Sequence, residues 1–368
     1  MSKLKFENFT YKRGEKRLIA LNTLLETTVK EKASDLHLTV GVPPTIRVNG
    51  QLTHIGGEKL TPLDTEKYVR GILNDLYDKY SSRGELDTSF SVAGLGRFRV
   101  NAFKQRGSDA AAIRVVGLKV PTLNDLNFPA VIKELTTKQR GLVLVTGPTG
   151  SGKSTTLAAM INEINITRSA HIVTLEDPIE YLHKHNKSII NQREIGKDTK
   201  SYASALKSVL REDPDVILVG EIRDLETISV ALTAAETGHL VFSTLHTIGA
   251  AKTVDRIIDV FPPYQQQQVK VQLAAVLKGV ISQQLVPKID GNGRIAALEV
   301  MISTSAIQNM IREGKTYQIE SSMQTGLKYG MRTMDMCLAE MEKKGLISYE
   351  DAMNYSVDRE MLSKIISL

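Results

Sequence analysis

Residues 147–155 have the residue types and the spacing of a phosphate-binding loop. They are Gly147, Pro148, Thr149, Gly150, Ser151, Gly152, Lys153, Ser154 and Thr155, a complete G-x-x-x-x-G-K-[ST] pattern. In such a loop the glycines let backbone N–H groups turn toward phosphate oxygens, the lysine reaches the β- and γ-phosphates, and the serine hydroxyl ligates Mg²⁺. An apolar run precedes the pattern and a helix-like stretch from Lys153 follows it. These flanks favour a nucleoside triphosphate site over a flexible turn rich in glycine and serine.

Acidic side chains that could act on the phosphates follow two later strand-like segments. The segment 174–180 carries Glu176, Asp177 and Glu180, and the next segment ends in Glu221. The carboxyl ends of parallel strands face the ligand crevice, so these acids could reach the γ-phosphate or its metal ion. Hydrolysis needs a carboxylate that orients or deprotonates water, and Glu180 and Glu221 are the two candidates, which the residues alone do not separate.

Both acidic segments have a feature that complicates this interpretation. In the second, Gly220 stands where an aspartate usually follows the apolar strand of a magnesium site, so we expect Glu221 to hold Mg²⁺ through water. In the first, Asp177-Pro178 could simply impose a turn at the end of a strand. The functional interpretation therefore depends on whether the two segments meet at the phosphate loop.

Two histidines, His239 and His246, bracket a fourth strand-like run. A lone histidine at a strand end is more often structural than catalytic. With Ser243 and Thr244 close to the second histidine, however, the pair indicates a sensor of the γ-phosphate.

Arginines in the first third of the chain indicate an anionic partner. Arg97 and Arg99 share one face of a predicted strand. If the next hairpin turns at residues 106–107, Arg99 lies directly opposite Arg114, and like charges in that position repel each other. A nucleotide held by a neighbouring subunit would relieve the repulsion. The acids that could neutralise these arginines instead are Glu85, Asp87 and Asp109.

The apolar periodicity predicts two domains of different architecture. A basic extension, residues 1–17, precedes a small α+β domain over residues 18–116, which has an antiparallel sheet. Its predicted helices are 18–32 and 61–77, and its predicted strands are 35–40, 45–48, 52–55, 89–92, 97–103 and 110–116. Residues 117–126 read as a linker. Residues 127–368 alternate buried strands with helices, which predicts an α/β domain with a mostly parallel sheet and C-terminal helices after about residue 303.

Composition excludes several classes of protein. Of the 368 residues, 42% are apolar and 24% charged, and no apolar run approaches the length of a membrane span. The single cysteine, Cys337, excludes internal disulfides and zinc sites built from several cysteines, which fits a reducing cytosol. A net charge of +6 from interspersed residues, without tryptophan, gives no reason to expect nucleic-acid binding. The basic extension is more simply a solvated tail than a membrane-binding segment.

The phosphate loop, the two acidic segments and the segment flanked by histidines resemble, in this order, the secretion ATPases. The sequence Ala-Ser-Asp-Leu-His-Leu at residues 33–38 adds to the resemblance. Among these ATPases, the chain resembles the PilT-type ATPases that retract type IV pili. The match runs from about Leu21 to the C-terminus and includes residues 190–194, 210–223 and 237–247. The phosphate loop alone would fit many families, whereas this series of segments fits one.

The resemblance implies a hexameric, ATP-hydrolysing motor with a RecA-like ATPase domain and a PAS-like N-terminal domain. It implies that Glu180 is the general base, that Glu221 organises Mg²⁺, and that His239 and His246 form a histidine box. Arg99 and Arg114 would act on the nucleotide of a neighbouring subunit. Such motors are cytoplasmic and lie at the inner membrane, where a platform protein of the pilus machinery, and in some systems the extension ATPase, are expected partners.

Departures from the family pattern leave alternatives open. Retraction motors carry Ala-Ile-Arg-Asn-Leu-Ile-Arg-Glu, whereas residues 306–313 have Gln308 in place of the first arginine and Met310 in place of leucine. An accessory motor, or an extension-type or type II secretion ATPase, is an alternative, although the extension-type and type II secretion relatives usually have a longer N-terminal region and a four-cysteine metal site. A nucleotide-gated scaffold that hardly hydrolyses ATP is a third hypothesis.

Overall fold

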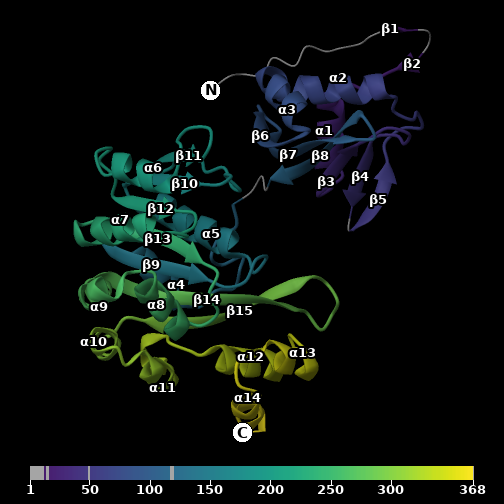
Figure 1. Ribbon diagram of the computed structural model, residues 1–368. Coiled ribbons are helices and arrows are strands. Elements are labelled where there is room, and N and C mark those ends of the chain that lie inside the picture. The colour runs from purple at the N-terminus through teal and green to yellow at the C-terminus, as the bar shows by residue number, and fades with distance from the viewer. Residues whose placement is uncertain (1–11, 14–15, 49, 117–119, 368) are drawn as a thin grey trace. The chain divides into compact units, whose positions relative to one another are not determined.

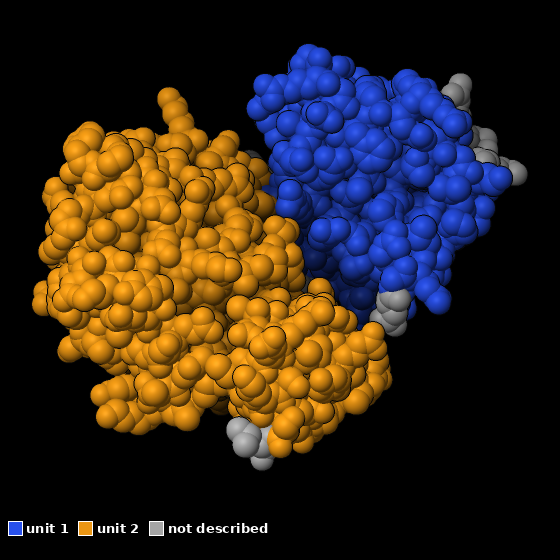
Figure 2. All heavy atoms as spheres, turned by 60° about the horizontal axis from the view of Figure 1, so that its bottom comes forward, with its two compact units in different colours: residues 1–119 blue, residues 120–368 orange. Residues whose placement is uncertain are grey.

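The chain forms two compact units, which Figure 2 shows in different colours. The computed structural model describes residues 12–13, 16–48, 50–116 and 120–367. Unit 1 spans residues 1–119 and unit 2 spans residues 120–368, so the boundary lies inside the segment expected to be a linker. Residues 117–119 of that segment, and most of the basic extension, lie outside the described residues. The described part of the extension forms two short antiparallel strands, β1 (Lys12–Arg13) and β2 (Lys16–Arg17).

Unit 1 is an antiparallel six-stranded sheet with helices packed on one face (Figure 1). Its strand order is β5-β4-β3-β8-β7-β6. The strands are β3 (Asp35–Leu38), β4 (Thr45–Val48), β5 (Gln51–His54), β6 (Glu85–Val92), β7 (Gly96–Gln105) and β8 (Ser108–Val116). The helices are α1 (Leu21–Lys30), α2 (Pro62–Leu73) and α3 (Tyr77–Arg83). The α+β character expected for this part of the chain is confirmed.

The alternation of residues along β7 explains why one face of this sheet is covered and the other is not. Phe98 and Val100 are buried against Leu24 of α1 and Val69 of α2. Because successive side chains of a strand point to opposite faces, Arg99 lies on the face away from the helices. Sequence periodicity thus places the arginines on the uncovered face of the sheet.

Unit 2 is built on a seven-stranded sheet in which all strands but the last run parallel. The order is β11-β10-β12-β13-β9-β14-β15, which Figure 1 shows as successive layers of the unit. The strands are β9 (Gly141–Thr146), β10 (His171–Glu176), β11 (Ile189–Glu194), β12 (Val216–Val219), β13 (Leu240–Leu245), β14 (Leu277–Pro287) and β15 (Arg294–Ile302). The predicted α/β fold with a mostly parallel sheet is confirmed.

Helices cover both faces of this sheet, as buried parallel strands require. Leu142 and Leu144 of β9 pack in the core beneath α6 (Tyr202–Val209), α7 (Leu225–Glu236), α8 (Ala250–Asp259) and α9 (Pro263–Val276). Val143 and Val145 point to the other face and pack in the core beneath α4 (Ala130–Thr136) and α5 (Lys153–Thr167). The continuous apolar character of β9 follows from this burial on both sides.

The segment from α9 to β15 has no counterpart among the elements expected from the sequence. Strand β14 has no regular alternation of apolar and polar residues, because it lies between β9 and β15 and its side chains enter the cores on both faces of the sheet. The polar residues Ser282 and Gln283 in its second half are also buried.

The chain ends in helices, as expected for the region after about residue 303. These are α10 (Ser305–Glu313), α11 (Ile319–Gln324), α12 (Met334–Lys343), α13 (Tyr349–Tyr355) and α14 (Arg359–Ser367). The last three share a small apolar core with Val286 of β14 and Ala297 of β15. Among the described residues, no helix combines the length and the apolar character needed to cross a bilayer.

Candidate functional site

The phosphate loop and the acidic segments emerge at one edge of the large sheet. Strands β10, β12, β13 and β9 are neighbours in that order and run in the same direction. The segments that follow them therefore leave from the same carboxyl edge, where ligands of open α/β sheets bind. The loop at 147–152 follows β9, the acidic turn at 176–180 follows β10, and Glu221 follows β12.

Lys153 lies within electrostatic reach of both candidate acids. Its Nζ donates to the backbone oxygens of Gly147 at 2.9 Å and Pro148 at 3.0 Å. Burial lowers the pKa of the Lys153 ammonium, and the charges of Glu221 and Glu180 oppose that shift without cancelling it. The structure thus brings together the lysine and both carboxylates singled out from the sequence.

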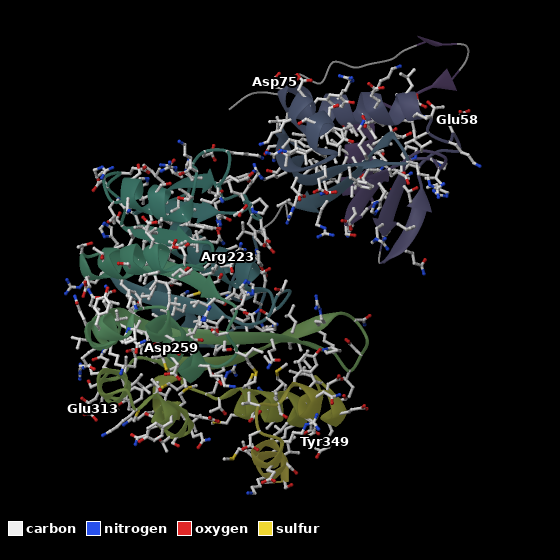
Figure 3. The ribbon with its side chains drawn as sticks, viewed as in Figure 1. Glu58, Asp75, Arg223, Asp259, Glu313 and Tyr349 are labelled. Atoms are coloured by element: carbon white, nitrogen blue, oxygen red, sulfur yellow. The ribbon has the colours of Figure 1, made fainter. Side chains whose placement is uncertain are left out.

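Glu221 is held by two basic groups. Arg223 Nη2 lies 2.6 Å from one carboxylate oxygen, and His246 Nε2 lies 2.9 Å from the other. Burial alone would raise the pKa of Glu221, but its hydrogen bonds and ion pairs with these two side chains outweigh burial and hold the pKa below its ordinary value. Glu221 is therefore an ionised carboxylate with both oxygens engaged. Figure 3 labels Arg223 at this edge of the sheet.

Lack of space at Gly220 explains why no aspartate occupies that position. A Cβ there would lie 3.0 Å from the backbone oxygen of Leu175 and 3.0 Å from the hydroxyl of Tyr202. Contacts this short are tighter than ordinary packing allows. The first acid after β12 is consequently displaced by one residue, to Glu221.

The carboxylates of the acidic turn differ in their contacts and exposure. Glu176 accepts hydrogen bonds from Thr174 Oγ1 at 2.6 Å and Gln192 Nε2 at 3.1 Å. Burial raises the pKa of Glu176, and the backbone N–H of Glu180 also donates to its carboxylate. The side chain of Glu180 is exposed, with no hydrogen bond or ion pair to any residue that the structure describes. Asp177 is exposed as well and has no hydrogen bond or ion pair in the described part of the chain, but Glu180 is the acid of this turn whose charge acts on Lys153.

The two candidate histidines lie at opposite ends of β13. His246 follows the strand and contacts Glu221, whereas His239 precedes it. His239 Nδ1 donates to the backbone oxygen of Ala234 at 2.9 Å, and its own carbonyl accepts from the N–H of Gly141, where β9 begins. Within one chain, the structure brings only His246 to the loop and the acids.

The arginine pairing expected in unit 1 is present. Gln105 pairs with Ser108 across the turn at 106–107, and Arg99 pairs with Arg114 in the same ladder. This pairing confirms the predicted register.

The two arginines differ in their partners. Arg114 Nε lies 2.9 Å from a carboxylate oxygen of Asp35, which is none of the acids considered from the sequence. Asp109, one of those acids, is buried against Tyr77, Tyr80 and Lys104 instead. Arg99 is exposed and makes no hydrogen bond or ion pair within the described part of the chain. Arg99 is therefore an uncompensated cation on the open face of unit 1.

Three contacts at the large-sheet site come from residues that the sequence analysis did not single out. The Tyr181 hydroxyl lies 2.9 Å from Thr155 Oγ1 and joins the acidic turn to helix α5. Arg223 pairs with Glu221, two positions away, a proximity that could have been noticed in the sequence. Gln283 of β14 contacts the phosphate loop, and no local sequence pattern predicts this contact.

The donor set at this edge fits a metal held mainly by phosphate and water. Within the described ranges, no group of three or more His, Cys, Asp or Glu side chains is arranged to hold a metal ion. The Ser154 side chain lies exposed in the first turn of α5, where a phosphate-bound Mg²⁺ takes a hydroxyl ligand. Mg²⁺ commonly keeps several waters and takes only one or two protein ligands beside the phosphates.

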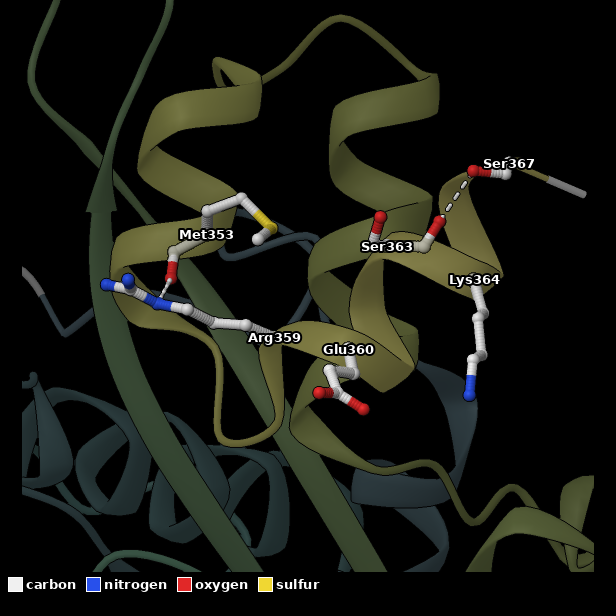
Figure 4. A pocket seen from close by; sticks show the side chains of 6 residues that line it. All are labelled: Met353, Arg359, Glu360, Ser363, Lys364 and Ser367. Atoms are coloured by element: carbon white, nitrogen blue, oxygen red, sulfur yellow. Dashed lines mark hydrogen bonds between the residues drawn. The ribbon is translucent and has the colours of Figure 1, made fainter.

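A separate pocket lies among the C-terminal helices. It has a volume of about 780 Å³ and lies between α13 and α14 (Figure 4). The residues lining it are Met353, Arg359, Glu360, Ser363, Lys364 and Ser367. None of them belongs to the phosphate loop or the acidic segments, so this pocket is no part of the candidate site.

Comparison with known proteins gives consistent matches over most of the chain. A family model described as type II/IV secretion system protein matches residues 95–364. The type IV pilus retraction ATPase PilT of Pseudomonas aeruginosa is 52% identical over 333 residues, which cover 90% of this chain and 96% of that protein. The twitching motility protein of Neisseria gonorrhoeae is 49% identical over 342 residues, covering 93% and 91%. A crystal structure of the pilus retraction motor PilT with bound ADP superposes with a TM-score of 0.88 at 50% identity, covering 94% of this chain and 99% of that one.

Proposed function

Because this chain belongs to the type II/IV secretion system protein family, we propose that it is an ATPase motor that retracts type IV pili. The observation that carries the proposal is the similarity to retraction ATPases at 49–52% identity along nearly the whole of both chains. The carboxyl edge of the large sheet supports it, because a phosphate loop and two ionisable acids meet there. The nucleotide is ATP.

The residues at this edge have distinct roles in hydrolysis. The loop 147–152 binds the phosphates through backbone N–H groups, and Lys153 reaches the β- and γ-phosphates. Glu180, with its free carboxylate, orients the attacking water and accepts its proton. Ser154 and, through water, Glu221 would hold Mg²⁺, which neutralises phosphate charge when bound. Contact of Glu221 through water agrees with the engagement of both its oxygens by Arg223 and His246.

Completion of the site requires a second chain. Arg99 and Arg114 of one chain approach the nucleotide of its neighbour and stabilise the charge that develops on the γ-phosphate. His246 positions Glu221 within its own chain. His239 lies at the other end of β13, so a nucleotide that it contacts would be one bound by another chain.

The assembly that uses this chemistry is a homo-hexameric ring at the cytoplasmic face of the inner membrane. A membrane-embedded platform protein of the pilus machinery is its partner, and the extension ATPase is a further one. Hydrolysis changes how the two units sit against each other, with residues 117–126 as the hinge. Nucleic acid is not a partner.

The alternative readings have less support. Extension-type and type II secretion ATPases are not favoured, because the relatives named for retraction and twitching match nearly the entire chain at about half identity. A non-hydrolysing scaffold has no need of a free Glu180 beside the phosphate loop. Gln308, whose Nε2 donates to the backbone oxygen of Ser303 at 3.4 Å, stands where retraction motors have arginine, and we propose that it adjusts coupling without changing the direction of the motor.

Deletion of the gene separates the motor types. Loss of a retraction motor leaves cells with abundant pili that do not retract, and wild-type protein restores retraction while a Glu180→Gln variant does not. Bald cells after deletion would instead identify an assembly motor. Pilus counts by electron microscopy and retraction by fluorescence microscopy read the two outcomes.

A further inference from the structure

Strand β14 runs beside the phosphate loop and carries a buried amide at the point of contact. In the parallel pairing of β14 with β9, Ser282 lies opposite Thr146, the last residue of β9. Gln283 is thus level with the start of the loop at Gly147. Its side chain is only 2% exposed. Glutamine is mostly exposed in proteins, so a buried glutamine is expected to have hydrogen-bond partners.

Both ends of this amide are used by the loop and the helix that follows it. Gln283 Nε2 donates to the backbone oxygen of Ser151 at 2.6 Å, and Gln283 Oε1 accepts from Thr156 Oγ1 at 2.6 Å. A carbonyl oxygen only accepts, so the orientation of the amide is fixed. The two contacts fasten the last turn of the loop to the first turns of α5 through a third element.

The backbone of the same residue limits what can occupy the loop. A Cβ at Gly147 would collide with the backbone oxygen of Gln283, and Gly147 has a φ of 140°, in the region that favours glycine. The backbone of Gln283 therefore packs against the loop at Gly147, and its side chain is hydrogen-bonded to the loop at Ser151.

We propose that Gln283 is a positioning residue that holds the phosphate loop in its binding conformation. It touches no reacting atom. Its contribution is to keep the loop ordered before the nucleotide arrives, so that binding does not have to order it. Loss of this contribution weakens substrate and transition-state binding alike, which raises KM and leaves kcat nearly unchanged.

The neighbouring glutamine provides a matched control. Gln284 lies on the same strand, is partly buried, and donates through Nε2 to the backbone oxygen of Tyr355 at 3.1 Å. It contacts helix α13 and not the phosphate loop. Gln283→Met and Gln284→Met therefore remove the same group from adjacent positions with different partners.

The test measures MgADP affinity by isothermal titration calorimetry on the full chain. Gln283→Met should raise the dissociation constant about tenfold, since two buried hydrogen bonds to the loop are lost. Gln284→Met should leave it within about twofold, a change no larger than minor repacking produces. In ATP hydrolysis, Gln283→Met should raise KM by a similar factor and leave kcat within about twofold. Equal affinity in wild type and Gln283→Met would overturn the proposal.

A second variant covers the case in which Gln283→Met does not fold. Thr156→Val removes only one of the two contacts with little change in shape, and it should weaken MgADP binding about threefold. Unchanged affinity in this variant would contradict the proposed role. When both single variants fold, the double variant should lose less affinity than the sum of the two losses, because they share one hydrogen bond.

This inference rests on the proposed nucleotide site and not on retraction. If Gln283→Met weakens MgADP binding but the wild-type protein fails to restore retraction, the positioning role stands and the motor function falls. If wild type restores retraction and Gln283→Met binds MgADP normally, the motor function stands and the positioning role falls.

Discussion

Two regions of this chain differ in how far their charged side chains are paired with opposite charges. At the carboxyl edge of the large sheet, charges compensate one another: Glu221 is bonded to Arg223 and His246, and Lys153 lies within reach of two carboxylates. On the open face of the sheet in unit 1, Arg99 faces Arg114 across the ladder; Arg114 is paired with Asp35, whereas Arg99 makes no ion pair with any described residue.

The difference indicates which region is complete and which awaits a partner. The large-sheet edge presents the phosphate loop, Lys153 and the exposed Glu180, and its arginine, Arg223, is paired with Glu221. The unit 1 face presents Arg99 without an ion pair in the described part of the chain, beside the Arg114–Asp35 pair. A site finished by arginines from another chain would make hydrolysis dependent on assembly, which suits a motor that must act as a ring.

Removal of Arg99 should have the largest effect of any change on the unit 1 face. Arg99→Ala is expected to lower kcat about 10³-fold, in the range found for arginines supplied in trans. Arg114→Ala should cost less, because Arg114 is partly neutralised by Asp35 at 2.9 Å. Steady-state phosphate release at saturating ATP compares the two variants. Equal rates in Arg99→Ala and wild type would break the contrast between the two regions.

At the large-sheet edge, the acids should differ as their environments differ. Glu180→Gln should lower kcat by about 10²–10⁴-fold, because it removes the group that accepts the proton of water. The control is Glu176→Gln, which alters a carboxylate bound to Thr174 and Gln192 and should act mainly on thermal stability. Wild-type turnover by Glu180→Gln would remove its assignment as general base.

A smaller loss is expected from the histidine that holds Glu221. His246→Ala removes the contact of 2.9 Å to Glu221 and should lower kcat about tenfold, since a hydrogen bond to a partly buried carboxylate is lost. A shift of the apparent magnesium requirement to higher concentrations should accompany it. If turnover and magnesium dependence both stay at wild-type values, His246 has no part in positioning Glu221.

The smallest effect is expected from Asp35. Burial raises the pKa of Asp35, but hydrogen bonds from Ser34 and Arg114 and the charge of Arg114 hold it below its ordinary value of 3.8. The ion pair therefore stabilises the folded chain above about pH 3.8, and this contribution is lost as the pH falls through the lower pKa of the folded state.

The size of that contribution follows from exposure. The Arg114 side chain is 68% exposed, so the pair should contribute less than about 1 kcal/mol. Asp35→Asn should lower the unfolding free energy by that amount at pH 7 and by less at pH 2, as measured by urea denaturation. A loss of equal size at both pH values would contradict the assignment.

Local patterns made the main parts of both regions predictable. The phosphate loop and Glu221 lie within a few residues of the strands that present them. A two-residue turn at 106–107 fixes the register of its hairpin, which is why the pairing of Arg99 with Arg114 could be foreseen.

Contacts between distant segments were not predictable. Gln283 and Thr156 are 127 residues apart, and they meet because β14 inserts next to β9 in the sheet. Proximity in sequence does not imply proximity in the fold: His239 and His246 flank one strand, and a strand of six residues separates its ends by about 20 Å. Short-range spacing identified the residues with chemical roles, whereas the sheet order decided which of them meet.

The most direct test of shared sites is a mixture of two inactive variants. Arg99→Ala retains an intact phosphate loop, and Lys153→Ala retains intact arginines, so mixed assemblies contain some sites with both. If sites are shared, ATPase activity should reappear when the purified variants are combined and reassembled, to roughly a quarter of wild type at equal proportions with random mixing of subunits. A mixture no more active than its separate components, with mixed assemblies verified by mass spectrometry, would contradict it.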